Sequence, residues 1–116
     1  MLYLSVEEAR LRAKIAPESP KKMAGYLSTH VLDSAHGKPG QGIKIELYRI
    51  TGEHQLLKTV FTNDDGRCDE RVLDGDAFQR GVYELVFHVA DYYREMGVEL
   101  PEQAFLDQVV IRFGID

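Results

Sequence analysis

The sequence has 116 residues, 44% of them apolar, which corresponds to one globular domain with a single modest hydrophobic core. Fourteen Lys and Arg residues against nineteen Asp and Glu residues give a net charge of −5, which argues against a nucleic-acid-binding protein, because that affinity comes mainly from clustered basic side chains. No apolar run approaches the length of a membrane helix, no secretory signal is visible, and a single cysteine excludes an internal disulfide. We therefore expect a cytoplasmic domain with neither a membrane nor a nucleic acid as partner.

Residues 1–22 differ from the rest of the chain and form a leader and linker with a net charge of +2. The string S-V-E-E at residues 5–8 has the form of a helix-capping box, and Leu4, Leu11 and Ile15 recur near helical spacing until Pro17. This pattern predicts a short helix over about 5–15. An isolated helix of this length is marginal in water, so it must dock on something or fray.

From residue 26 onward, the hydrophobic period changes from near 3.6 to near 2, which indicates strands separated by turns. The pattern predicts one short helix at 91–97, and strands at 26–32, 43–49, 57–61, 81–89 and 107–113, with a weak strand near 68–72. Many short strands with turn signals between them are typical of an all-β sandwich. The predicted fold is thus a sandwich preceded by a short helical leader.

The end of the sequence does not fit a finished sandwich. The chain stops at Asp116, three residues after a predicted strand, and the count of about six strands is below the seven or more that sandwiches usually need. An uncovered last strand would be prone to aggregation. We therefore expect that part of the sandwich is missing or that another segment covers it.

The sequence contains four histidines, of which His30 is the most informative. It lies in an otherwise apolar strand, and if Leu27, Thr29 and Val31 face the core, then His30 faces outward. Either a structural or a chemical role fits this position. The other three are expected to be structural or solvated, with His36 and His54 in turns and His88 at the end of a strand.

Two neighbouring residues after the turn at 62–66 are further candidates for chemistry. Arg67 could be a solvated side chain beside acidic residues or a binding group. Cys68 is a poor nucleophile, because the carboxylates around it disfavour the thiolate. The acidic residues between 64 and 76 do not fit a calcium-binding loop, and no phosphate-binding or zinc-protease motif is present.

Several ordered strings resemble the transthyretin-related 5-hydroxyisourate hydrolases over residues 24–115. L-S-T-H-V-L-D at 27–33, followed by G-K-P at 37–39, is similar to the family's N-terminal signature, and T-N-D-D-G-R-C at 62–68 is similar to its second signature. The strings that continue the resemblance lie at 81–89, 91–94 and 105–115.

The resemblance implies a transthyretin-like sandwich of two antiparallel sheets, assembled as a homotetramer that is a dimer of dimers. It implies hydrolysis of 5-hydroxyisourate to 2-oxo-4-hydroxy-4-carboxy-5-ureidoimidazoline, in urate degradation towards allantoin, with no metal or organic cofactor. His30 matches the family's first catalytic histidine and Arg67 its catalytic arginine. A neutral imidazole can accept a proton from water, and a guanidinium can orient an anionic ring and stabilise an oxyanion.

The family pattern continues beyond the end of this sequence, into a second catalytic histidine, two further strands and a terminal Tyr-Arg-Gly-Ser. The expected organisation is therefore a leader at 1–22 and a hydrolase domain at 23–116 that lacks the usual C-terminal strands. Two other hypotheses remain open. One is a catalytically inactive transthyretin-like domain for small-molecule binding or assembly, and the other is a structural sandwich module of a larger protein.

Overall fold

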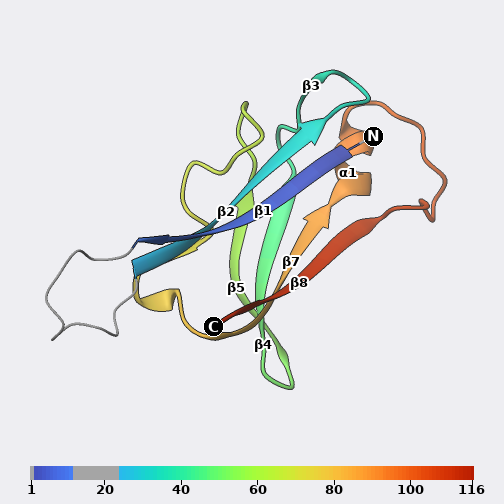
Figure 1. Cartoon of the computed structure of the whole chain (residues 1–116). Helices are drawn as coiled ribbons and strands as arrows, with labels where there is room; N and C mark the ends of the chain where they lie inside the picture. The colour runs from blue at the N-terminus through green and yellow to red at the C-terminus, as the bar shows by residue number, and fades with distance from the viewer. Residues whose placement is uncertain (1, 12–23) are drawn as a thin grey trace, which may run out of the picture.

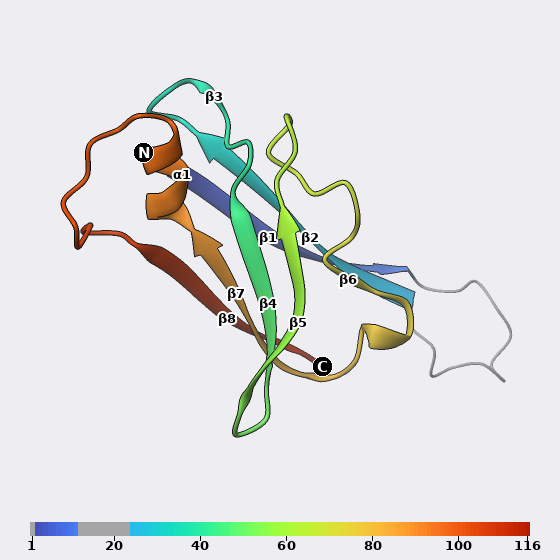
Figure 2. The same cartoon turned by 180° about the vertical axis from the view of Figure 1, so that it is seen from behind.

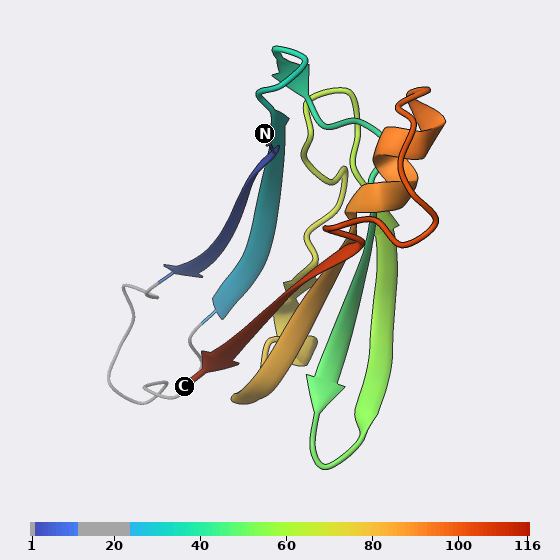
Figure 3. The same cartoon turned by 90° about the vertical axis from the view of Figure 1, so that its right-hand side faces the viewer.

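The computed structural model describes residues 2–11 and 24–116, and, for residues 2–11 and Ala24, only the side chain of Leu4. Two antiparallel sheets lie face to face as the layers of a sandwich, and the α-helix formed by Val89–Glu95 covers one end (Figures 1 and 3). The elements in chain order are β1 (Leu2–Leu11), β2 (Ala24–Asp33), β3 (Lys38–Pro39), β4 (Lys44–Ile50), β5 (His54–Phe61), β6 (Leu73–Asp74), a 3₁₀ turn (Gly75–Ala77), β7 (Gly81–His88), α1 (Val89–Glu95) and β8 (Gln108–Ile115).

The first sheet is built around β2. Strand β1 pairs with one edge of β2, and β3 and β6 pair with the other edge. The second sheet has the order β5-β4-β7-β8, and Figure 2 shows β4 and β5 in front of the first sheet. None of the helices in the described residues is long and apolar enough to cross a membrane.

The core lies between the two sheets and comes from alternate positions of the strands, as the period-2 pattern predicts. Its fully buried side chains include Leu27, Val31, Ile43, Ile45, Leu47, Tyr83, Leu85 and Phe87. Burying side chains of this size stabilises the fold by about 1.5–3 kcal/mol each relative to exposure. The predicted two-sheet sandwich with one short helix is therefore confirmed.

The predicted helix in the leader is wrong. Residues 2–11 form β1, which pairs with β2 from Leu2 opposite Asp33 to Leu11 opposite Ala24. The capping-box string is only a local signal, and a lone short helix gains little in water, whereas a strand beside β2 gains a partner for its backbone groups. The alternation of Leu2, Leu4 and Val6 with less apolar residues fits this strand. The rest of the predicted helix and the linker lie outside the described residues.

Two smaller predictions need adjustment. No strand forms at 68–72 within the described residues, and the short β6 follows at 73–74 instead. The helix begins at Val89 with His88 as its N-cap, so Asp91 lies in its first turn. Gly97 has φ of 85°, the left-handed conformation that commonly follows a helix, as its predicted role as a stop requires.

Candidate active site

His30 lies on the outward face of β2, as its place in the alternation predicts. Leu27 and Val31 are 1% and 0% exposed, whereas His30 is only half-buried. The side chains of a strand alternate between faces, so the inward residues anchor β2 on the core and turn His30 away from it. The apolar neighbours of His30 therefore fix its direction.

Arg67 is brought beside His30 as its cross-strand partner. The two residues form an isolated antiparallel bridge, and Val31 N–H donates a hydrogen bond of 2.9 Å to the carbonyl oxygen of Gly66. This bond flanks the bridge, so His30 and Arg67 are a non-hydrogen-bonded pair, in which the Cα atoms are about 4.5 Å apart and the side chains share one face. Residues 37 positions apart in the sequence thus meet where the turn contacts β2.

The turn that carries Arg67 is closed by its own residues. Asn63 Oδ1 accepts hydrogen bonds from Asp65 N–H (2.9 Å) and Arg67 N–H (3.2 Å), and Gly66 N–H donates to the Asn63 carbonyl oxygen (2.9 Å). Buried Thr62 ties the turn to the rest of the sandwich, because its hydroxyl donates to the carbonyl of Gly40 at 2.6 Å. These bonds explain why the turn needs a side-chain oxygen acceptor at 63 and a hydroxyl at 62.

Gly66 is required by close approach. Its φ is 77°, and a Cβ atom there would lie 2.1 Å from the carbonyl oxygen of Val31. No other residue type fits this conformation and this distance without moving the turn away from β2. The glycine therefore sets how closely Arg67 can approach His30.

The ring of His30 is held in one tautomer. Nε2 lies 3.0 Å from the carbonyl oxygen of Asp65, and because a carbonyl only accepts, Nε2 carries the proton. In the neutral ring, Nδ1 then has the free lone pair and is the atom able to accept a proton. A neutral base of this kind beside an exposed guanidinium can activate water next to a group that attracts negative charge.

The other three histidines each contact a carboxylate. His36 Nδ1 donates to buried Asp33 at 2.7 Å, His54 lies 3.3 Å from Glu84, and His88 Nε2 is hydrogen-bonded to Glu46. The sequence predicts solvated side chains in turns for His36 and His54. Both are exposed, but His54 is the first residue of β5 and both have a carboxylate partner.

Cys68 is unsuited to nucleophilic attack. Burial raises the pKa of its thiol, and the carboxylates of Asp69 and Glu70 raise it further. The thiolate, which is the reactive form, is therefore disfavoured. This direction agrees with the prediction from its acidic neighbours in the sequence.

A buried carboxylate at the end of the strand that carries His30 was not identified from the sequence. Asp33 ends β2 and is 0% exposed, and it accepts hydrogen bonds from the Tyr92 hydroxyl (2.7 Å) and from the side chain and backbone of His36. Burial alone would raise the pKa of Asp33, but these hydrogen bonds outweigh it and leave the pKa below its usual value. The Tyr92 bond joins the end of β2 to α1, a link between residues 59 positions apart that no local signal reveals.

The comparison with known families decides the identity of the fold. A model described as the HIUase/transthyretin family matches residues 27–116. The chain belongs to this family. The resemblance that the two signature strings indicate is thus confirmed, and the match begins within β2, so β1 lies outside it.

Relatives and solved structures agree with this family. The 5-hydroxyisourate hydrolase of Pseudomonas aeruginosa is 66% identical over 92 residues, which cover 78% of this chain and 73% of that protein. The 5-hydroxyisourate hydrolase of Mesorhizobium japonicum is 56% identical over 99 residues, covering 84% and 80%.

Two solved structures have a similar fold. A crystal structure of (S)-allantoin synthase matches with a TM-score of 0.67 and 36% identity over 73% of this chain, which spans 33% of that protein. The structure of Klebsiella pneumoniae 5-hydroxyisourate hydrolase matches with a TM-score of 0.57 and 26% identity, over 72% of this chain and 73% of that one.

Proposed function

We propose that this chain hydrolyses 5-hydroxyisourate to 2-oxo-4-hydroxy-4-carboxy-5-ureidoimidazoline, with His30 and Arg67 as the groups that act on the substrate. The substrate is inferred from the names of the relatives. The roles of His30 and Arg67 are inferred from their position as a cross-strand pair. A base and a cation on one face are what hydrolysis of a cyclic amide needs.

The proposed reaction adds one water across a ring C–N bond. His30 Nδ1 takes a proton from the attacking water, whose oxygen bonds to the amide carbon, and Arg67 stabilises the negative charge that develops on the carbonyl oxygen. When the C–N bond breaks, the leaving nitrogen takes a proton from the imidazolium, which restores neutral His30. The new carboxyl group and the N–H of the opened ring account for all atoms of the water.

Assembly and location are part of the same proposal. We expect a homotetramer built as a dimer of dimers, which the resemblance to the family implies, and such an assembly would cover apolar Leu32 on β2 and Val110 on β8, which are 37% and 52% exposed. Light scattering after size-exclusion chromatography would test whether the particle has the mass of four chains. We expect the enzyme in the cytoplasm, where free Cys68 stays reduced.

The test of the proposal is the decay of freshly generated 5-hydroxyisourate, followed by ultraviolet absorbance with and without the intact chain. We expect acceleration above the spontaneous rate, and a loss of about 100-fold or more in kcat/KM for His30→Ala and for Arg67→Ala. Binding without acceleration would instead support a carrier domain. Near-normal turnover in either variant would remove that residue from the mechanism.

A further inference from the structure

The leader strand β1 lies beside the strand that carries the site, although it falls outside the segment that matches the family. The match begins at residue 27, whereas β1 comprises Leu2–Leu11 and pairs with the whole length of β2. In this register, Ser5 is directly opposite His30. Strand β1 is therefore placed to contact the backbone of His30.

Three backbone hydrogen bonds show which way the peptide groups of β2 point. Val31 N–H donates to Gly66, the Val31 carbonyl accepts from Gly40 N–H, and the Leu27 carbonyl accepts from Val72 N–H. All three bonds lie on the edge of β2 opposite β1. Because successive residues of a strand direct their N–H and C=O groups to opposite edges, those of His30 are directed at β1.

Ser5 and His30 are thus a hydrogen-bonded pair of the antiparallel ladder, in which the two residues exchange both N–H···O bonds. On the other edge, His30 and Arg67 are a pair without such bonds. The backbone N–H and C=O of His30 are accordingly paired with β1, while its ring is hydrogen-bonded to the Asp65 carbonyl. Without β1, the backbone beneath the ring would lose its partner, and the ring would no longer be held in line with the Asp65 carbonyl.

Leu4 anchors the leader strand next to this pair. It lies opposite Val31, packs against the hydrophobic core, and lines an apolar pocket of about 410 Å³ with Val89 on α1 and Val109 on β8. An apolar side chain packed against the core in this position helps to hold β1 in place beside β2. The register that places Ser5 opposite His30 is therefore fixed by burial as well as by pairing.

We infer that β1 is a positioning strand for the site, whose backbone at Ser5 holds the main chain of His30 so that the ring stays aligned with Arg67. The inference rests on the proposed function only in naming His30 as the base. It assigns the leader a role in the hydrolase rather than that of a tail. The residue at position 5 acts through its peptide group.

The test uses three full-length variants that differ in which peptide group they remove. Ser5→Pro removes an N–H that faces β2, Val6→Pro removes one that faces away from β2, and Ser5→Ala keeps the N–H and removes only the hydroxyl. A proline is tolerated on an edge strand where its missing N–H faces away from the partner. Val6→Pro is therefore the matched control for the backbone, and Ser5→Ala for the side chain.

We expect Ser5→Pro to lower kcat by about tenfold or more, with a smaller change in KM, because a displaced base misaligns the reacting groups. In ¹⁵N spectra of the imidazole, the same variant should populate the tautomer with its proton on Nδ1, as the ring loses its alignment with Asp65. Val6→Pro and Ser5→Ala should match the unmodified chain in both readouts. Equal effects of the two prolines would overturn the inference.

Amide hydrogen exchange of the unmodified chain gives a second test that no variant can spoil by unfolding. The N–H of His30 should be protected to the same degree as that of Val31, because each has a backbone partner on its own edge of β2. Exchange of the His30 amide at the rate of an open loop would show that β1 does not hold it. If the chain fails to accelerate 5-hydroxyisourate decay, the proposed function fails, while exchange and tautomer data still decide the role of β1.

Discussion

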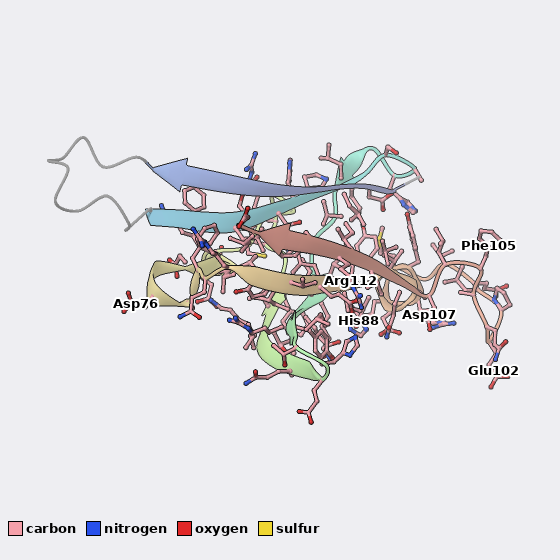
Figure 4. The ribbon with its side chains drawn as sticks, turned by 60° about the horizontal axis from the view of Figure 1, so that its bottom comes forward. Asp76, His88, Glu102, Phe105, Asp107 and Arg112 are labelled. Atoms are coloured by element: carbon pink, nitrogen blue, oxygen red, sulfur yellow. The ribbon has the colours of Figure 1, made fainter. Side chains whose placement is uncertain are left out.

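The two sheets each carry histidines on an outward face, but they use them differently. On the first sheet, His30 contacts a neutral backbone carbonyl and lies beside Arg67. On the second sheet, His88 contacts Glu46 and His54 contacts Glu84. Figure 4 labels His88 together with Arg112, which forms an ion pair with Glu84 and donates a hydrogen bond to it from Nε.

We expect this difference to separate the proposed site on the first sheet from a structural surface on the second. A carbonyl partner fixes the tautomer of His30 without adding charge, and the neighbouring group is a cation that can attract an anionic substrate. On the second sheet, His54 and His88 each have a carboxylate partner, so their interactions are satisfied within the protein. Titratable residues therefore occur on both faces, and their partners decide which face can do chemistry.

Of the predicted substitutions, we expect the largest loss of stability at Gly66, where the turn that carries Arg67 approaches β2. Gly66→Ala should destabilise the fold by about 3 kcal/mol or more and reduce turnover, because the new Cβ meets the Val31 carbonyl at 2.1 Å. Gly42 is the matched control, since its φ is 78° and nothing lies within 4 Å of a Cβ there. Gly42→Ala should cost only the backbone strain of about 1–2 kcal/mol.

Urea unfolding measures the stability of both alanine variants, and the 5-hydroxyisourate assay measures their turnover. Together they separate the effect of backbone strain, which both variants have, from the effect of the clash with β2, which only Gly66→Ala has. We expect Gly42→Ala to keep its turnover after correction for the folded fraction. Equal losses of stability and activity at the two positions would show that the approach of Gly66 to β2 does not matter.

On the second sheet, Arg112 should affect stability without affecting catalysis. Its Nε and Nη2 atoms lie 2.8 and 2.7 Å from Glu84 Oε2, and Glu84 is only 8% exposed. Arg112→Ala leaves this carboxylate with a weaker set of partners, which should cost about 1–2 kcal/mol, since the guanidinium itself is largely exposed.

Adding Glu84→Gln to Arg112→Ala should recover part of this loss, because a neutral amide needs no cation. Denaturant titrations of the single and double variants give the coupling, and the kinetic assay gives the rate. A large fall in kcat in a folded Arg112→Ala protein would contradict the view that this face is structural.

The alternation of apolar residues was sufficient to predict most of the strands, and it placed His30 on the outward face of β2. It was insufficient for the leader, because residues 5–8 carry a helix-start pattern while Leu2, Leu4 and Val6 carry a strand pattern. Which pattern prevails depends on whether β2 offers an open edge, and that is a property of the folded sheet.

The site was predictable in its residues but not in its geometry. Signature strings pointed to His30 and Arg67, and their catalytic roles remain predictions. Their pairing requires the contact of Gly66 with Val31, and the contribution of Asn63 requires the closed turn. Contacts such as Glu46 with His88, 42 positions apart, arise only from strand register, so no local pattern could reveal them.

The smallest expected effect concerns Glu46 and the pH dependence of stability. The hydrogen bond from His88 lowers the pKa of Glu46 below its ordinary value of 4.5, and the Tyr48 hydroxyl lowers it further, while burial opposes both. Because the pKa is lower in the folded than in the unfolded state, ionised Glu46 stabilises the fold at pH values above about 4.5. This contribution is lost as the pH falls through the lowered folded-state pKa.

Glu46→Gln should therefore flatten the acid side of the stability curve, with the largest difference from the unmodified chain at neutral pH and little difference well below pH 4.5. Glu53→Gln, which removes the same charge from an exposed turn, is the control and should leave the slope unchanged. Urea unfolding at a series of pH values measures both. A Glu46→Gln curve parallel to that of the unmodified chain would mean that the His88 contact adds nothing to folding, whereas a flattened curve with unchanged turnover would assign this second face to stability alone.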